Sequence, residues 1–262
     1  MKLTFLGTGA ADWDINAYSP DAFFRRNSGA LINDDLIIDP GPHIFHFAKH
    51  NGTPDMFKNV KNLIVTHSHG DHFDPWTVAE LCRLYGCTLW ADKTCMDKLR
   101  LLVGERAAAF VNFRETVINL DYKIGNYTVT PLRANHATEL PDETPRIYLV
   151  QENDRILYYG CDSSWIPTTS WNIIREKPVN AMVMELTCGE TAPDDWRIFE
   201  HNTLDMLELM LKMFRKYNLF APDVKYYVSH MARTLHTDHE TLKNTLAPMA
   251  VTPAYDGMVI EI

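Results

Sequence analysis

Four side chains that can bind a metal ion stand within six consecutive positions of this sequence, in the stretch Thr66-His67-Ser68-His69-Gly70-Asp71-His72. The short, β-branched run Leu63-Ile64-Val65 before it predicts a buried strand, so the histidines follow the C-terminal end of a strand. Alternate residues share one face of an extended chain, so His67 and His69 can reach one ion. Gly70 allows a sharp turn, after which Asp71 and His72 can reach a second ion. Imidazole and carboxylate ligands favour zinc, manganese or iron over calcium.

Three more predicted strands end in a side chain of this kind, namely His136, Asp162 and His230. Each alone is more often a capped polar group than a ligand. With the four residues above they make seven, which is the number that a dinuclear site with one bridging carboxylate requires. The sequence therefore predicts a site for two divalent metal ions.

The His67–His72 stretch also resembles the His-x-His-x-Asp-His signature of the metallo-β-lactamase superfamily, and the order of the later residues is similar to that family along nearly the whole chain. The resemblance implies one hydrolase domain over residues 1–262, with the α/β four-layer αβ/βα sandwich of that superfamily. It implies two ions, zinc or manganese, with iron as a further option. It also implies the ligand roles: His67, His69 and His136 on the first metal, Asp71, His72 and His230 on the second, and Asp162 as the bridge. Asp71 and Asp162 count as catalytic residues as well as ligands.

A further histidine, His201, stands in Glu200-His201-Asn202-Thr203 at the start of a predicted amphipathic helix. On its own it could merely precede an N-cap at Asn202 or Thr203. Together with Val228-Ser229-His230, however, this stretch resembles the paired motifs of the phosphodiesterase branch of the superfamily. That branch holds the transfer-RNA 3′-processing endonucleases and the cyclic phosphodiesterase of phosphonate breakdown. The start of the chain is similar to the same branch at residues 5–11, 25–28 and 37–41.

This resemblance implies hydrolysis of a phosphodiester, in which a metal-bridged hydroxide attacks phosphorus and His201 acts as the general acid on the leaving group. A net charge of −9 and the lack of a Gly-rich basic arm favour small or cyclic phosphodiesters over RNA. The phosphonate-pathway enzyme typically has cysteines in an early loop, whereas the first cysteine here is Cys82. Arg133, Arg146 or Arg233 could clamp a phosphate, and His236 or His239 could join the site.

Three alternatives stay open. An RNA 3′-processing endonuclease would require a basic face. A lactonase-type hydrolase would require an apolar pocket and no role for His201. A diiron oxidoreductase or a metal-binding module is less favoured, because all the signature histidines are present.

Composition predicts an ordinary soluble protein, with 46% hydrophobic and 23% charged residues. Five cysteines without a Cys-x-x-Cys pair fit a reducing compartment, so we expect a cytoplasmic protein. We expect no signal peptide and no membrane partner. A homodimer is compatible with the sequence.

Apolar patterns and turn residues predict the remaining elements. Strands are expected at 3–6, 29–33, 36–39, 63–65, 87–91, 109–113, 116–120, 127–133, 147–151, 156–159, 181–186, 224–228 and 258–262. Helices are expected at 44–50, 75–85, 93–103, 203–218 and 238–246. Residues 12–27 read as an irregular loop, and His43, His46 and His50 as surface or core histidines rather than ligands.

Overall fold

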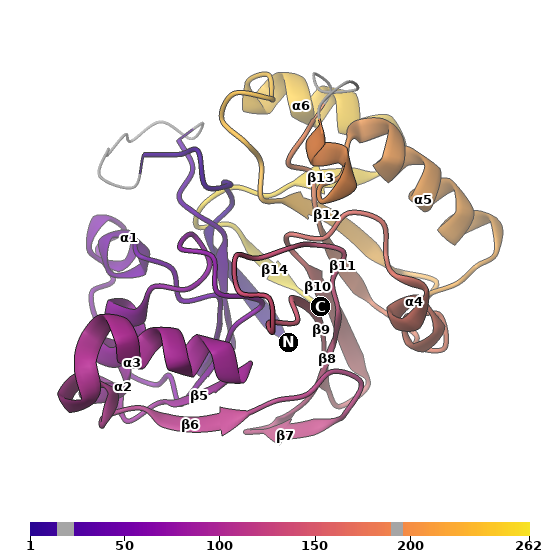
Figure 1. Ribbon diagram of the computed structural model, residues 1–262. Helices are drawn as coiled ribbons and strands as arrows, with labels where there is room; N and C mark the ends of the chain where they lie inside the picture. The colour runs from indigo at the N-terminus through magenta and orange to yellow at the C-terminus, as the bar shows by residue number, and fades with distance from the viewer. Residues whose placement is uncertain (15–23, 190–195) are drawn as a thin grey trace.

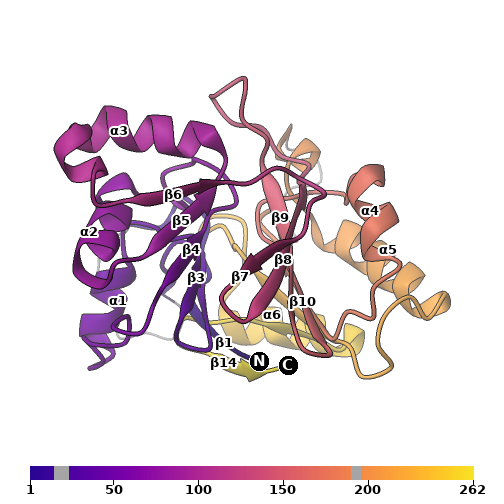
Figure 2. The same ribbon diagram turned by 90° about the horizontal axis from the view of Figure 1, so that it is seen from below.

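Two seven-stranded sheets lie face to face in the computed structural model, which describes residues 1–14, 24–189 and 196–262 (Figure 1). Helices cover the outer side of each sheet, so the described chain forms four layers (Figure 2). This arrangement is the predicted αβ/βα sandwich, and that prediction is confirmed. The extent of the domain over residues 1–262 stays a prediction.

The first sheet is built by the N-terminal half of the chain together with the last strand. Its order is β14-β1-β2-β3-β4-β5-β6. The bounds are β1 (Lys2–Gly7), β2 (Gly29–Ile32), β3 (Leu36–Ile38), β4 (Asn62–Ile64), β5 (Thr88–Ala91), β6 (Asn112–Glu115) and β14 (Val259–Glu261). Strands β3 to β6 run parallel, whereas β1 pairs antiparallel with both β14 and β2.

The second sheet is built by the C-terminal half of the chain. Its order is β13-β12-β11-β10-β9-β8-β7. The bounds are β7 (Tyr122–Ile124), β8 (Tyr127–Arg133), β9 (Arg146–Glu152), β10 (Arg155–Gly160), β11 (Ala181–Glu185), β12 (Lys225–Ser229) and β13 (Val251–Pro253). Strands β10 to β13 are parallel, and the antiparallel strand β9 lies between β8 and β10. Strands β8, β10, β11 and β12 therefore all end at the same edge.

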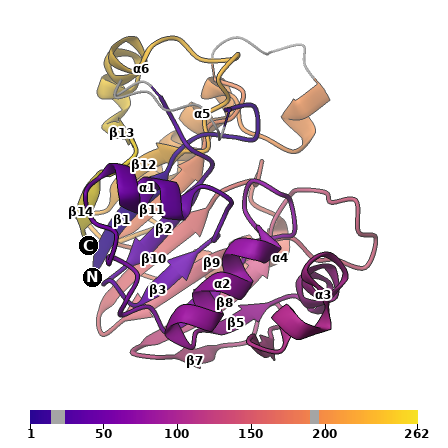
Figure 3. The same cartoon turned by 90° about the vertical axis from the view of Figure 1, so that its left-hand side faces the viewer.

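Three helices of the described ranges cover each sheet, and a short 3₁₀ turn precedes α5 and another follows α6. The bounds are α1 (Ile44–His50), α2 (Pro75–Tyr85), α3 (Lys93–Ala108), α4 (Thr168–Ile174), η1 (Trp196–Phe199), α5 (Leu204–Lys216), α6 (His239–Leu246) and η2 (Ala247–Met249). Helices α1 to α3 lie on the outer side of the first sheet (Figure 3), and α4 to α6 lie on the second.

Three apolar clusters hold these layers together. Phe47, Val78 and Leu99 pack from α1, α2 and α3 against the first sheet, and α5 buries Leu207 and Leu211 against the second. A third cluster fills the space between the sheets. No helix in the described ranges is long and apolar enough to cross a membrane.

The helix that follows the signature loop begins and ends where its sequence dictates. Asp74 caps α2 by accepting a hydrogen bond from the backbone N–H of Thr77 at 2.8 Å, and Pro75 occupies the first turn. Gly86 ends the helix in the left-handed conformation, with φ 67°. The loop before α2 is therefore fixed at its C-terminal end.

The predictions around residues 104–124 were wrong in part. Helix α3 continues past a break at Gly104, where φ is 77°, and residues 109–111 form no strand. Residues 116–120 form no strand either, because Asn119 turns the chain with φ 65° and Val117 and Leu120 are exposed. The edge strands β6 and β7 lie on either side of that turn. Helix α4 and strand β13 were not predicted.

Candidate metal centre

All the predicted ligands follow the C-terminal ends of strands. Strand β4 leads to the signature loop, β8 to His136, β10 to Asp162 and β12 to His230. These strand ends meet at one edge of the sandwich, which is where open α/β sheets place their binding sites. The fold thus brings the four residues of the signature loop together with three residues that are far from them in the sequence.

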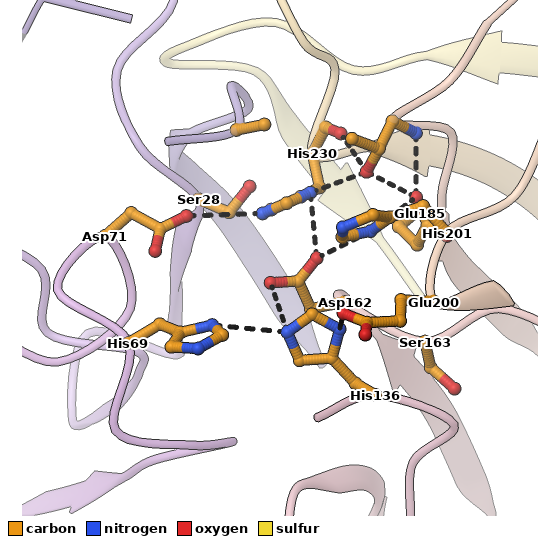
Figure 4. A network of polar contacts seen from close by, with 12 residues as sticks. Ser28, His69, Asp71, His136, Asp162, Ser163, Glu185, Glu200, His201 and His230 are labelled. Atoms are coloured by element: carbon orange, nitrogen blue, oxygen red, sulfur yellow. Dashed lines mark hydrogen bonds and ion pairs between the residues drawn. The ribbon is translucent and has the colours of Figure 1, made fainter. Parts of the chain in front are cut away.

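The first group of ligand atoms lies around His69. Its Nδ1 is 2.9 Å from His67 Nε2 and 3.2 Å from His136 Nε2. Asp162 Oδ2 lies 3.4 Å from His67 Nε2 and 3.6 Å from His136 Nε2. Figure 4 shows His69, His136 and Asp162 converging, and the four ligand atoms lie within 4.8 Å of one another.

The second group lies beside the first and shares Asp162. His72 Nε2 is 3.1 Å from His230 Nε2 and 3.1 Å from Asp162 Oδ2. Asp71 Oδ2 is 3.4 Å from both imidazole nitrogens. Because Asp162 presents the same oxygen to both groups, the geometry is that of a bridging carboxylate. The arrangement agrees with the predicted ligand sets, and the individual ligand roles stay predictions.

Hydrogen bonds behind His67 of the first group and His72 of the second affect which imidazole nitrogens carry a proton. Thr66 Oγ1 lies 2.9 Å from Asp39 Oδ2, so the hydroxyl donates to this carboxylate. The same hydroxyl lies 3.0 Å from His67 Nδ1 and therefore accepts from it. His72 Nδ1 donates to Asp39 Oδ2 at 2.9 Å. His67 thus carries its proton on Nδ1 and directs the lone pair of Nε2 into the cluster. Burial alone would lower the pKa of His72, but Asp71 and Asp39 raise it well above its usual value, so its Nε2 also holds a proton that a bound metal ion would displace.

A second chain of the same kind serves His230. Thr187 Oγ1 lies 2.5 Å from Glu185 Oε2 and donates to it. His230 Nδ1 lies 2.8 Å from the hydroxyl and donates to it. His230 Nε2 therefore presents a lone pair toward His72 Nε2, and Asp71 and Asp162 present carboxylate oxygens to the same place. Imidazole nitrogens and carboxylate oxygens thus converge there, and this donor set fits bound divalent metal ions.

The charges of the cluster fit metal binding as well. Burial lowers the pKa of His136 to about 4, so this ring is neutral near pH 7. Burial alone would raise the pKa of Asp162, but the neighbouring His230, His136 and His201 hold it well below its usual range. The carboxylate is therefore ionised. Neutral imidazole and ionised carboxylate are the forms that bind a metal ion.

The backbone is strained at three residues that hold the site. Asp39, Asp162 and His230 adopt the left-handed conformation, with φ between 55° and 56°. For residues other than glycine this conformation costs roughly 1 kcal/mol or more. Each of the three ends or follows a strand, so the surrounding hydrogen bonds hold a backbone geometry that the local sequence disfavours.

His201 lies beside the bridging carboxylate. Its Nδ1 is 3.1 Å from Asp162 Oδ1 and 3.9 Å from Glu185 Oε2. Burial alone would lower the pKa of His201, but the ion pair with Asp162 outweighs burial and raises it to about 9. Thr203, rather than His201, caps α5 by accepting from the N–H of Met206. The imidazole is thus positioned at the cluster and lines the cavity that opens onto it.

A cavity of about 270 Å³ opens onto the cluster. Polar side chains form most of its described lining: Asp12, His69, Asp71, His136, Asp162, Thr187, Arg197, Glu200, His201 and His230. Trp196 and three alanines, Ala10, Ala11 and Ala232, complete it.

Comparison with known proteins identifies the family. The model of the beta-lactamase superfamily domain matches residues 35–238. The chain belongs to this superfamily. No curated protein matches the sequence.

Solved structures of the metallo-β-lactamase fold resemble the chain over its whole length. Zn²⁺-bound PqqB from Methylobacterium extorquens is 14% identical, with a TM-score of 0.75 and 100% of each chain covered. A diphosphatase from the PhnP family is 21% identical, with a TM-score of 0.72 and 100% and 97% covered. The short form of human tRNase Z is 18% identical, with a TM-score of 0.70 and 100% and 99% covered. At these identities the likeness shows the fold alone. The fold and the family make the chain a member of a superfamily of metal-dependent hydrolases.

The arginines and histidines that were possible further site residues lie outside the group of seven candidate metal ligands. Arg146 is buried and bonded to Asp92 at 2.5 Å, so it holds the fold and is not a phosphate clamp. Arg133 is exposed at the end of β8 and is not among the described residues that line the cavity. Arg233, His236 and His239 line a neighbouring cavity of about 230 Å³.

His43, His46 and His50 were expected to be surface or core residues rather than ligands. His43 is buried, close enough to the cluster for Asp71 and His72 to affect its pKa, and His46 and His50 are exposed on α1. Residues 15–23 of the predicted loop at 12–27 lie outside the described residues.

Sequence reasoning did not identify the residues that support the ligands. Asp39, Thr66, Glu185 and Thr187 fix imidazole protons, and Glu200 Oε2 lies 3.6 Å from His136 Nδ1. A weak indication was present for the first two, because Asp39 ends a strand beside the signature and Thr66 opens it. Glu185 and Thr187 have no local pattern of their own.

Proposed function

We propose that the protein is a metal-dependent phosphodiesterase acting on small or cyclic phosphodiesters, with zinc or manganese as cofactor. One observation carries this proposal: His201 Nδ1 lies 3.1 Å from Asp162 Oδ1, whereas the other oxygen of this carboxylate, Oδ2, faces both ligand groups. A protonated imidazole at that place is a donor beside the metals. Ester hydrolysis with a poor leaving group requires such a donor.

The residues of the chain divide the work. His67, His69 and His136 would hold one ion and Asp71, His72 and His230 the other, with Asp162 between them. When bound, the two ions would activate water as the nucleophile and neutralise charge on the phosphoryl oxygens.

The general acid, His201, lies beside Oδ1 of Asp162. Asp162 Oδ1 and Glu185 hold the imidazolium of His201. His201 Nε2 donates its proton to the leaving alkoxide as the phosphorus–oxygen bond breaks. An acyclic diester then leaves an alcohol and a phosphomonoester, whereas a cyclic diester leaves one product that carries both groups.

The charge of the chain supports a small substrate. A net charge of −9 disfavours long RNA, whose binding depends on cationic contacts to phosphates. The cavity of about 270 Å³ also suits a compact substrate. We therefore favour small phosphodiesters over RNA as substrates. We also propose that the protein is cytoplasmic.

The test compares two leaving groups on protein loaded with zinc or manganese. Bis(p-nitrophenyl) phosphate releases a weakly basic phenolate, whereas a 2′,3′-cyclic nucleotide releases an alkoxide that needs a proton. Asp162→Ala should lose activity on both substrates. His201→Ala should lose about 10²- to 10⁴-fold on the cyclic diester and much less on the nitrophenyl diester.

His46→Ala is the matched control, because His46 is an exposed histidine away from the cavity. It should leave both rates unchanged. Wild-type protein that holds two ions per chain, hydrolyses lactones and leaves both phosphodiesters intact would refute the proposal. Equal losses on both substrates in His201→Ala would refute the role as general acid.

A further inference from the structure

A large aromatic side chain lies at the mouth of the metal cavity. Trp196 opens the 3₁₀ turn η1 and lines the cavity, yet 68% of its surface is exposed. Phe199 in the same turn is 73% exposed and is not among the described lining residues. The two residues share chemistry and exposure, and only Trp196 faces the site.

Hydrogen bonds fix this turn relative to the catalytic groups. The backbone N–H groups of Glu200 and His201 donate to the carbonyl of Arg197 at 2.9 and 2.7 Å. Ser164 Oγ, two residues after Asp162, donates to the carbonyl of Ile198 at 3.2 Å. The turn is therefore tied both to His201 and to the loop of the bridging carboxylate.

The direction of the proposed reaction gives Trp196 a definite side of the substrate. His201 protonates the leaving oxygen, so the leaving half of the substrate lies on the side of His201. The turn that carries Trp196 runs directly into His201. Among the described lining residues Trp196 alone offers a large apolar face, since the others are polar side chains or alanines.

We propose that Trp196 stacks on an aromatic ring carried by the leaving alcohol, so that the substrate class is a phosphodiester with a nucleobase on its leaving-group side. This inference rests on the proposed function, because His201 defines that side. An indole provides a flat π surface on which a nucleobase can stack, largely independently of which base it is.

The experiment measures binding, so it needs no turnover. Benzyl phosphate and cyclohexylmethyl phosphate carry the same phosphate and rings of similar size, but only benzyl phosphate has a π face. Their dissociation constants are measured by calorimetry on metal-loaded protein. Wild type should bind benzyl phosphate about tenfold more tightly than cyclohexylmethyl phosphate, in line with the strength of base–aromatic stacking.

Variants locate this preference. Trp196→Ala should lose about tenfold in affinity for benzyl phosphate and little for the cyclohexyl compound, whereas Trp196→Phe should keep most of the preference. Phe199→Ala is the matched control and should bind both ligands as wild type does. Because both side chains are exposed, these variants should fold normally, which their melting temperatures check.

Three outcomes would overturn the inference: unchanged binding in Trp196→Ala, equal weakening of both ligands, or an equal loss in Phe199→Ala. The proposed function can fail separately. If phosphodiesters are not hydrolysed but the preference still depends on Trp196, the aromatic subsite stands and its assignment to a leaving group falls. If phosphodiesters are hydrolysed and Trp196→Ala binds as wild type, the proposed function stands and the subsite falls.

Discussion

Replacing Thr187 with valine should weaken the binding of one metal ion and leave the binding of the other unchanged. The hydroxyl accepts the proton of His230 Nδ1 at 2.8 Å while donating to Glu185. Valine keeps the shape of threonine and removes the acceptor. The buried N–H of His230 then either stays unpaired or moves to Nε2, which removes the lone pair that would bind the ion.

The size of the effect follows from the remaining contacts. An unpaired buried donor costs about 1–3 kcal/mol, and loss of a support of this kind weakens metal binding about 10- to 100-fold. Asp162 Oδ1 lies 3.2 Å from His230 Nδ1 and can accept a hydrogen bond from it when the threonine hydroxyl is gone. We therefore expect a loss near the lower end, about tenfold. The ion held by His67, His69 and His136 should be unaffected, because its support runs through Thr66.

The assay is competition for zinc with a coloured chelator, which resolves the affinities of two ions per chain. Thr187→Ser keeps the hydroxyl and should bind both ions almost as wild type does. Equal weakening of both ions in Thr187→Val, or an equal loss in Thr187→Ser, would refute the reasoning. So would unchanged binding in Thr187→Val.

Three further predictions concern other residues. Glu143 accepts from Ser68 Oγ at 2.6 Å and so ties the loop of His136 to the signature loop. Glu143→Ala should lower zinc affinity about tenfold in the same competition assay, and the exposed Asp142→Ala in the same loop should not. Burial lowers the pKa of His43 to about 3, so the unfolded chain binds more protons between pH 3 and 6.5. Stability should fall as pH drops below 6.5, by about 1.4 kcal/mol per pH unit from this group, and urea unfolding of His43→Gln should show a slope smaller by that amount. The ion pair with Asp162 raises the pKa of His201 to about 9 against the effect of burial, so phosphodiesterase activity should decline as pH rises through that value. A pH–rate profile in which His201→Ala retains the same alkaline decline would contradict this role.

The signature loop could be predicted because its information is local. His67, His69, Asp71 and His72 lie within one turn, after a strand that the apolar run identifies. The later candidates were predictable for a different reason. Parallel strands end at the same edge of a sheet, so strand-end residues meet even when their separation in sequence is large.

The supporting contacts could not be predicted because they depend on tertiary contacts alone. Glu185 has the sequence of an ordinary strand residue, yet it accepts hydrogen bonds from Thr187 and from the backbone of Asn202. Strand β6 was placed too early at 109–113 and β7 was missed, because exposed residues such as Asn112 and Glu115 carry no apolar alternation. Pairing with one neighbouring strand, which composition does not reveal, is what places them in a sheet.

Each of the two ligand groups draws two residues from the loop after β4 in the first sheet and two from loops of the second sheet. A bound ion would therefore join the N-terminal and C-terminal halves of the chain. A ligand at a thousandfold excess over its dissociation constant stabilises a fold by about 4 kcal/mol. We expect the two halves of the metal-free protein to separate more readily and the chain to be cut faster by proteases. The supply of metal would then determine how much of the protein a cell retains.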